Sequence, residues 1–405
     1  MRISTSQFYQ SGLNSILDQQ NGLNRTQKQI STGLKVITPS DDPIATISII
    51  NLEQEIALTE RYIANNDIAT ANLNIEEATL QSTTDILQRV RELILSGGNA
   101  TYGDRERNSL AVEMKQLLGQ LVGLANFKNS SGDYLFSGHK INATPFTQSP
   151  SGSYEYNGDQ GSREVQISTS SQLAMNDSGY DVFQNMLNGN KNFVSSQSLI
   201  NTGTGIINAG SVVDNASYVS DTYTITTVDL GAGVPGYTIT DGLGAVVGLP
   251  GNTYVDGGNI SFNGISINIS GAPAIGDTFT LEPSSRQDIF ETVQNAITAL
   301  ETPRSSPADG AHLQNALART LGDLDLGMEH IGTIHAEVGT RLNILQNQKL
   351  INSDFIITSK ISLSNVRDLD LAEAITDLNL RKMGLEAAQS SFVRIQNLSL
   401  FNFLR

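Results

Sequence analysis

Cysteine and tryptophan are both absent from this chain of 405 residues. Without cysteine the chain can form no disulfide, no thiolate nucleophile and no cysteine-ligated zinc site. The absence is compatible with a cytosolic or an exported protein, so it leaves the compartment open. Aromatic residues make up only 6% of the chain, and the core must therefore be built mainly from Leu, Ile, Val and Ala.

Basic residues are scarce as well. The chain has 25 Lys and Arg against 41 Asp and Glu, which gives a formal net charge of -16. Phosphate backbones and anionic membrane surfaces bind clusters of Lys and Arg, and the sequence contains no such cluster. We therefore expect neither nucleic acid nor a membrane as a partner.

Long hydrophobic runs are missing too. No stretch reaches the roughly 18 apolar residues that a membrane-spanning helix needs. The segment from Met1 to Gln7 also lacks the apolar core of a secretory signal peptide. If the protein is exported, we expect a route that cleaves no such signal.

Residues for catalysis or metal binding are few. Two of the four histidines, His330 and His335, are five positions apart and thus lie on different faces of a helix. Glu76 and Glu77 are adjacent, so their side chains diverge, and we interpret them as a solvated helix face. No glycine-rich phosphate loop and no Gly-x-Ser-x-Gly motif is present. We therefore expect no enzyme activity, no cofactor and no metal.

What the chain does have is a long heptad pattern between residues 317 and 366. Apolar residues recur there three and four positions apart, interrupted by His335 and Lys349, and resume at Ile356, Leu363 and Val366. The stripe before Lys349 consists of Leu321, Leu324, Met328, Ile331, His335, Val338, Leu342 and Leu345. This spacing predicts a long helix of the coiled-coil type, which needs a long partner.

The partner helices are predicted within the first 125 residues or so. Asp42 is a good N-cap and Pro43 suits the first helical position. The apolar pattern of the helix that begins there weakens at Asn65 and Asn66. A second apolar run follows and extends to Ile94. A third helix is predicted from Arg105 to about Asn126. Together these segments would form a long antiparallel helical rod with the run at 317–366.

Between residues 140 and 285 the composition changes to Gly, Ser, Thr and Asn, and alternation replaces the heptads. Asn263-Gly264 is a preferred type I′ turn between two alternating runs and predicts a β-hairpin. Residues 153–156 are predicted to face residues 165–167. A further helix is predicted from Asp288 to Leu300, and it ends before Pro303.

The two ends of the chain carry amphipathic helices with few apolar residues. Such helices are marginal alone, so we expect them to be weakly ordered until a partner covers them. The acidic cluster at Asp368 and Asp370 is predicted to mark the start of the last helix. The apolar residues predicted to form an assembly interface are Leu13, Ile16, Leu17, Leu23, Ile30, Leu371, Ile375, Leu378, Leu385, Phe392, Ile395 and Leu398.

The predicted fold class is therefore mainly α with a β-rich insertion. Terminal assembly helices are expected at 1–40 and 366–405, a helical rod domain at 41–139 and 286–365, and an outward β-rich domain at 140–285.

Specific segments resemble a known family. Residues 29–34, 39–43 and 86–93 near one end, and 364–372 and 398–400 near the other, resemble the terminal regions of bacterial flagellins. The resemblance covers about residues 1–135 and 286–405. Residues 132–138, Gly-Asp-Tyr-Leu-Phe-Ser-Gly, and residues 271–279 are similar to the family's hook-associated members rather than to filament subunits.

The resemblance implies a structural adaptor that joins hook to filament in the extracellular flagellum. It implies type III export, a dedicated chaperone on the C-terminal region, and self-association in a ring or helical layer between the first hook-associated protein and flagellin. The alternative within the family is flagellin, the filament subunit itself. A secreted coiled-coil adhesin with a β-rich head would explain the architecture but not both terminal signatures.

Overall fold

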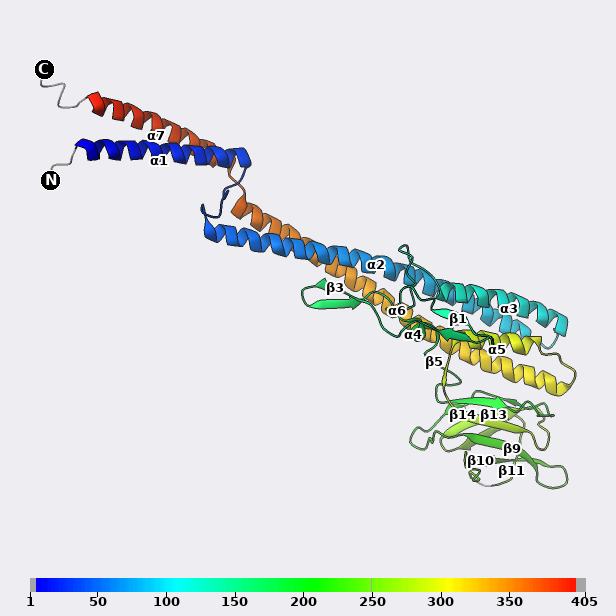
Figure 1. Cartoon of the computed structure of the whole chain (residues 1–405). Helices are drawn as coiled ribbons and strands as arrows, with labels where there is room; N and C mark the ends of the chain where they lie inside the picture. Colours follow the sequence, from blue (N-terminus) through cyan, green and yellow to red (C-terminus); the bar gives the residue numbers. More distant parts are fainter. Residues whose placement is uncertain (1–4, 249, 398–405) are drawn as a thin grey trace, which may run out of the picture. The chain divides into compact units, whose positions relative to one another are not determined.

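The computed structural model describes residues 5–248 and 250–397 (Figure 1). The helices are α1 (Thr5–Thr32), α2 (Pro43–Gly97), α3 (Asp104–Ala125), α4 (Gly179–Phe183), α5 (Ile289–Glu301), α6 (Pro307–Arg367) and α7 (Leu371–Asn397). The strands are β1 (Phe146–Gln148), β2 (Tyr154–Tyr156), β3 (Glu164–Ser168), β4 (Ser171–Ala174), β5 (Met186–Leu187), β6 (Phe193–Gln197), β7 (Ile206–Ile207), β8 (Ser211–Val212), β9 (Tyr223–Asp229), β10 (Pro235–Thr240), β11 (Asn252–Thr253), β12 (Asn259–Phe262), β13 (Ile265–Ser270), β14 (Thr278–Pro283) and β15 (Arg286–Gln287). The predicted fold class, mainly α with a β-rich insertion, is confirmed.

The chain divides into two compact units. The terminal unit comprises Met1–Asn65 and Asn347–Arg405, and the central unit comprises Asn66–Gln346. Helices α2 and α6 contribute residues to each. The three-part division into assembly helices, rod and β domain stays a prediction.

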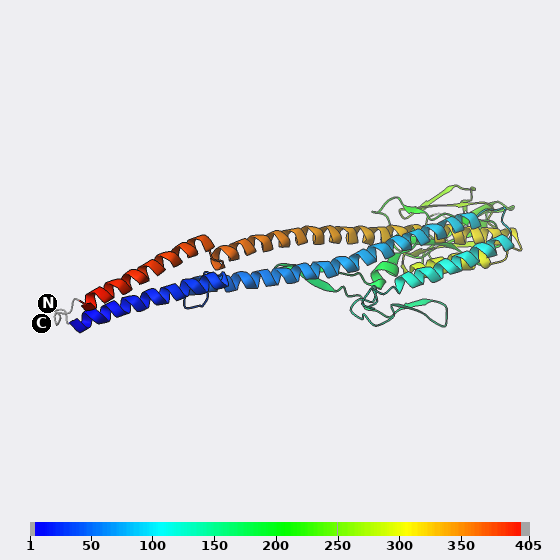
Figure 2. The same ribbon diagram turned by 90° about the horizontal axis from the view of Figure 1, so that it is seen from above.

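In the terminal unit, α1 and α7 lie side by side, as Figures 1 and 2 both show. Helix α1 ends at Gly33, which has a φ of 69° and donates its N–H to the Gln29 carbonyl at 2.8 Å, as the sequence predicts for a C′ glycine. Helix α7 begins after Asp370, whose side chain accepts from the N–H of Ala372 at 2.9 Å. Both caps agree with the sequence prediction.

The first part of α2 packs against the last part of α6 in the same unit. The predicted N-cap is confirmed, because Asp42 Oδ1 accepts from the N–H groups of Ile44 and Ala45 at 3.1 and 3.0 Å. Ion pairs join Glu60 to Lys360 at 3.2 Å and Glu53 to Arg367 at 3.5 Å. The partners run in opposite order along the two helices, which are therefore antiparallel. Their small core consists of Ile56, Ile356 and Leu363, with Ile49, Leu52 and Ile63 packed against it.

In the central unit the predicted heptad residues form the core. Leu73, Leu80 and Leu87 of α2 are fully buried, in one cluster with the α6 stripe. The buried α6 members of that cluster are Leu313, Leu317, Leu324, Ile331, Ile334, Val338 and Leu345. Helix α3 packs beside α5, and the rings of Phe146, Phe183 and Phe290 meet with centroids 5.0–5.7 Å apart. The seam is therefore continuous across the helical part of this unit.

Two sequence interpretations in α2 are wrong. The helix does not divide near Asn65 and Asn66 but continues unbroken for 55 residues. An asparagine costs a helix only about half a kcal/mol, less than the heptad packing on either side contributes. Glu76 is also not part of a solvated face. It is fully buried, and its Oε1 accepts from the N–H of Asp177.

The β-sandwich, residues 193–283, has a core of its own. One sheet has the order β11-β10-β9-β14-β6, and the other has β12-β13-β7 with β8 also paired to β13. Ile225 and Phe279 from the first sheet share one buried cluster with Ile267 from the second. The predicted hairpin is confirmed: Phe262 pairs with Ile265, and Asn263 and Gly264 have φ of 42° and 74°, as a type I′ turn requires.

The predicted pairing of residues 153–156 with 165–167 is wrong. Strand β2 instead pairs with β1, and β3 pairs with β4. Strand β2 thus pairs with the strand that precedes it in the sequence, and β3 pairs with the strand that follows it. The short connections of these two hairpins cost less loop-closure entropy than longer ones.

The cap of α5 gives a testable pH dependence. Asp288 accepts from the Glu291 N–H at 2.5 Å, and burial raises its pKa to about 6. An aspartate in an unfolded chain titrates near 3.9, so between about pH 4 and pH 6 the folded chain holds the extra proton. The free energy of unfolding therefore falls as pH rises through this window. We expect Asp288→Asn, which keeps a capping oxygen without the charge, to remove this slope and to be about 1–2 kcal/mol more stable than wild type at pH 7.

Denaturant unfolding between pH 4 and pH 8 measures this difference. Asp309 is the matched control, since it too accepts from backbone N–H groups, those of Ser305 and Ser306, but in its case these hydrogen bonds lower the pKa. Asp309→Asn should therefore reduce stability at pH 7. If Asp288→Asn also lost stability there, the charged cap would contribute more than its burial costs.

Candidate assembly surface

The structure brings most of the predicted interface residues together on the α1–α7 pair. Six of them are half-buried between or beside the two helices: Ile16, Leu23, Ile30, Leu378, Leu385 and Phe392. Leu13, Leu17, Leu371 and Ile375 are exposed. Ile395 lies in α7, but its side chain falls outside the described part of the chain, and Leu398 lies outside the described residues altogether. That these residues form an assembly interface stays a prediction.

Small and polar residues hold α1 against α7. Thr26 Oγ1 donates to Asp377 Oδ2 at 3.1 Å, and Arg381 Nε donates to the same oxygen at 2.6 Å, which lowers the pKa of Asp377. A Cβ at Gly12 would meet the Phe392 ring at 2.9 Å, so the glycine permits the close approach of the two helices. The order of these pairs shows that α1 and α7 are antiparallel.

This pair has almost no core. Among the side chains described on α1 and α7, the buried ones are Thr26 and Ala374. Two helices of 28 and 27 residues with so little apolar burial cannot be stabilised by their mutual packing alone. The α1–α7 pair is therefore an incomplete packing unit.

Further apolar residues of the terminal unit, not predicted from the sequence, are exposed. Ile44, at 80% exposure, and Ile47 lie at the start of α2, while Ile357 and Ile361 line a shallow depression with Lys360 on α6. The signal that could have found them is the apolar spacing outside the heptad seam. We call the whole set the terminal apolar surface; it consists of Leu13, Leu17, Ile44, Ile47, Ile50, Leu350, Ile351, Phe355, Ile357, Ile361, Leu371, Ile375, Leu380, Met383 and Val393.

Several charged residues of the terminal unit pair within it. Arg25 pairs with Asp41 at 3.3 Å, and Arg367 contacts both Asp368 and Glu53. Hydrogen bonds from Ser364 and Arg367 lower the pKa of Asp368. Exposed pairs of this kind contribute little to stability. The terminal apolar surface is therefore the feature of this unit that most requires a partner.

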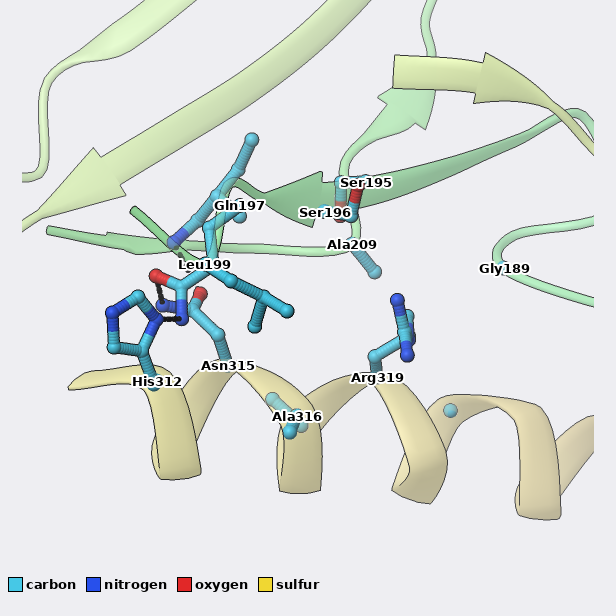
Figure 3. Close-up of a pocket in the computed structure, with 13 residues that line it drawn as sticks. Gly189, Ser195, Ser196, Gln197, Leu199, Ala209, His312, Asn315, Ala316 and Arg319 are labelled. Atoms are coloured by element: carbon cyan, nitrogen blue, oxygen red, sulfur yellow. Dashed lines mark hydrogen bonds between the residues drawn. The ribbon is translucent and has the colours of Figure 1, made fainter. Parts of the chain in front are cut away.

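A pocket in the central unit lies between α6 and the β-sandwich and contains serine and histidine (Figure 3). Ser195 Oγ donates to the Asn208 carbonyl at 2.7 Å, and Ser196 Oγ pairs with Thr280 Oγ1 at 2.7 Å. His312 instead contacts Gln197 and Asn201. No hydroxyl here is bound to an imidazole, so the arrangement lacks the activated nucleophile of covalent catalysis.

Within residues 5–248 and 250–397, no three His, Asp or Glu side chains gather closely enough to bind a metal ion. Within the same residues, no helix has the length and hydropathy to span a membrane.

The segment 132–138, which resembles hook-associated proteins, is part of the core. Leu135, Phe136 and Ser137 are fully buried, and the N–H of Gly179 donates to the Phe136 carbonyl at 2.8 Å. Gly132 and Gly138 have φ of 87° and 68°, and a Cβ at Gly138 would collide with Asp159. The motif thus shapes a close turn against the helices rather than presenting a binding surface.

Comparison with known proteins shows which families this chain resembles. The model of the bacterial flagellin N-terminal helical region matches residues 3–141. Flagellar hook-associated protein 3 of Salmonella typhimurium is 25% identical over 406 residues, covering 100% of both chains. A filament core protein of Treponema maltophilum, 26% identical, aligns with only 30% of this chain and 42% of its own length.

A solved structure gives the same result. The crystal structure of flagellar hook-associated protein 3 from Legionella pneumophila superposes with a TM-score of 0.76 at 34% identity. The match covers 78% of this chain and 98% of that one. The likeness to hook-associated proteins thus extends through the β-sandwich, whereas the likeness to the filament protein covers less than a third of the chain.

Proposed function

Because this chain belongs to the family of flagellar hook-associated protein 3, we propose that it is the structural adaptor at the junction of hook and filament. The observation that carries this proposal is the full-length match to hook-associated proteins, set against the partial match to a filament protein. The same contrast disfavours flagellin, the alternative from the sequence.

Subunits assemble as a ring or helical layer through the terminal helices. Support comes from the terminal apolar surface and from the lack of a core between α1 and α7. Burying a large aliphatic side chain contributes about 1.5–3 kcal/mol, and a half-exposed one contributes about half of that. Some ten such residues would supply roughly 10 kcal/mol against the cost of association. The helices therefore gain their stability in the assembled layer.

The layer lies between the first hook-associated protein and flagellin, outside the cell. Export is by the type III route, and a dedicated chaperone covers the C-terminal region before assembly. Supporting this last step, α7 exposes Leu371, Ile375 and Leu380 in the single chain. Apolar side chains of this kind require cover until the final partners are in place.

Deletion of the gene tests the function. We expect bare hooks on the cells and unpolymerised flagellin in the medium, because export continues while the filament has no base to grow on. Electron microscopy of the hooks and immunoblots of the medium give the two readouts. Restoring the intact gene should restore filaments.

Two other outcomes would overturn the proposal. If flagellin were absent from both cells and medium, the chain would be the filament subunit. If filaments were normal, the chain would have another role, such as that of a secreted adhesin.

A further inference from the structure

The β-sandwich is a separate module whose contact with α6 is polar. Its apolar core does not merge with the core of the helices. Four groups make a polar contact, and we call them the latch: the side chains of His312 and Asn315 from α6 and of Gln197 from the sandwich, all three drawn in Figure 3, together with the backbone carbonyl of Asn201.

Asn315 fixes the hydrogen-bond directions in the latch. Its Oδ1 accepts from the Ile207 N–H at 2.9 Å, and since that group can only donate, the amide cannot be reversed. Its Nδ2 therefore donates, and the acceptors around it are Gln197 Oε1 at 2.6 Å, the Ala311 carbonyl at 2.9 Å and the Gly205 carbonyl at 3.0 Å. The side chain is buried, so no water can substitute for these partners.

This orientation determines the state of His312. Because Gln197 Oε1 faces Asn315, Gln197 Nε2 faces His312 Nδ1, at 2.6 Å. An amide NH₂ only donates, so Nδ1 must be without a proton and must accept. The ring proton is thus on Nε2, which donates to the Asn201 carbonyl at 3.1 Å. The latch requires a neutral imidazole in one tautomer.

We propose that neutral His312 holds the β-sandwich on α6 and that protonation of His312 opens the latch. A proton on Nδ1 would point at the hydrogens of Gln197 Nε2, and Gln197 cannot turn over without setting its NH₂ against that of Asn315. The hydrogen bond between Gln197 and His312 is therefore lost, and the chain Asn315–Gln197–His312 is broken.

The charged groups around His312 leave this conflict unresolved. On α6, Asp309 lies one turn before His312 and Arg319 lies two turns after it. Residues 193–213 of the sandwich carry no charge. Asp277, before β14, already accepts from the N–H groups of Thr202, Gly203 and Ala274. Both oxygens of Asp277 are thus already engaged by backbone N–H groups.

Opening does not detach the sandwich. The Gly189 N–H donates to Asp323 Oδ1 at 2.7 Å, and Lys191 pairs with Glu329 at 2.8 Å, next to the chain that enters β6. The change is therefore a local loosening around β6 and β7. It does not depend on the function proposed above.

Hydrogen exchange of residues 195–209 in the full chain tests the proposal. Between pH 7.5 and pH 5 a histidine in water changes from neutral to charged. After correction for intrinsic rates, we expect protection in this segment, including the Ile207 N–H, to fall about ten-fold or more at pH 5. Protection of the α3 amides should not fall, because the Asp288 cap of the neighbouring α5 makes the helical part no less stable at pH 5.

Two variants test whether His312 causes the pH dependence of protection. In His312→Asn the Oδ1 atom replaces Nδ1 as the acceptor and cannot titrate, so protection should become independent of pH. His330→Asn is the control, because His330 Nε2 also bonds a backbone carbonyl, that of Asp181 at 2.6 Å, but lies outside the latch; it should keep the wild-type response. Equal protection of the wild type at both pH values, or a pH response retained in His312→Asn, would overturn the proposal.

Discussion

Replacing Arg341 by alanine is expected to lower the free energy of unfolding by about 3–5 kcal/mol. Arg341 lies on α6, and its Nη2 contacts Asp177 Oδ2 at 2.6 Å. The two side chains are only 12% and 20% exposed. Glu76 of α2 is fully buried beside them, and its Oε1 accepts from the Asp177 N–H at 3.2 Å. Arg341 is thus the cation that faces two carboxyl groups in a site with little access to water.

The expected loss follows from what alanine would leave behind. Burial raises the pKa of Glu76 well above its usual range, the charge of Asp177 raises it further, and Arg341 opposes both. Without Arg341, Glu76 becomes harder still to ionise and Asp177 remains as a poorly solvated charge without a cation. An uncompensated buried charge costs several kcal/mol, which is more than the net gain from most ion pairs.

Chemical denaturation of the full chain measures the loss, with Arg91→Ala as the matched control. Arg91 of α2 pairs with Asp325 of α6 at the similar distance of 2.7 Å, but these side chains are 41% and 47% exposed. That variant should lose far less stability, because water and salt screen an exposed pair. Adding Asp177→Asn to Arg341→Ala should recover part of the stability. Equal losses from Arg341→Ala and Arg91→Ala would show that burial does not decide the strength of these pairs.

The helices could be predicted from the sequence because their signals are local and repeated. The heptad stripe, the Asp42–Pro43 cap and Gly33 each depend on residues within a turn or two, and the structure has each of them. The Asn263-Gly264 hairpin belongs to the same class, since two residues fix its turn type.

What could not be predicted depends on residues far apart in the chain. Glu76 looks solvated in the sequence because its hydrogen-bond partner, Asp177, lies 101 positions away. His312 gains its role from Gln197, 115 positions away. The terminal apolar surface could be predicted only in part from the sequence. Periodicity located the apolar residues of α1 and α7, but which of them face outward depends on how the two helices pair. Ile44 and Ile47 of α2 were missed because they lie outside the heptad seam.

Replacing both Leu371 and Ile375 by serine is expected to prevent assembly onto the hook while leaving the single chain folded. Their exposures of 52% and 50% in the single chain mean that folding gains little from them. In the assembled layer each would bury about a further half of its side chain, worth about 1 kcal/mol. The double variant therefore loses about 2 kcal/mol per subunit, which weakens each contact by roughly 30-fold.

The measurement is the amount of this protein on hooks isolated from deletion cells that express each variant, together with circular dichroism of the purified chain. Leu243→Ser is the control, since Leu243 is 96% exposed but lies in the β-sandwich. It should assemble as the wild type does. If the double variant assembled normally, α7 would not form the interface through this face. If it instead lost helicity as a single chain, Leu371 and Ile375 would be needed for folding, and the separation of assembly helices from the rod would be wrong.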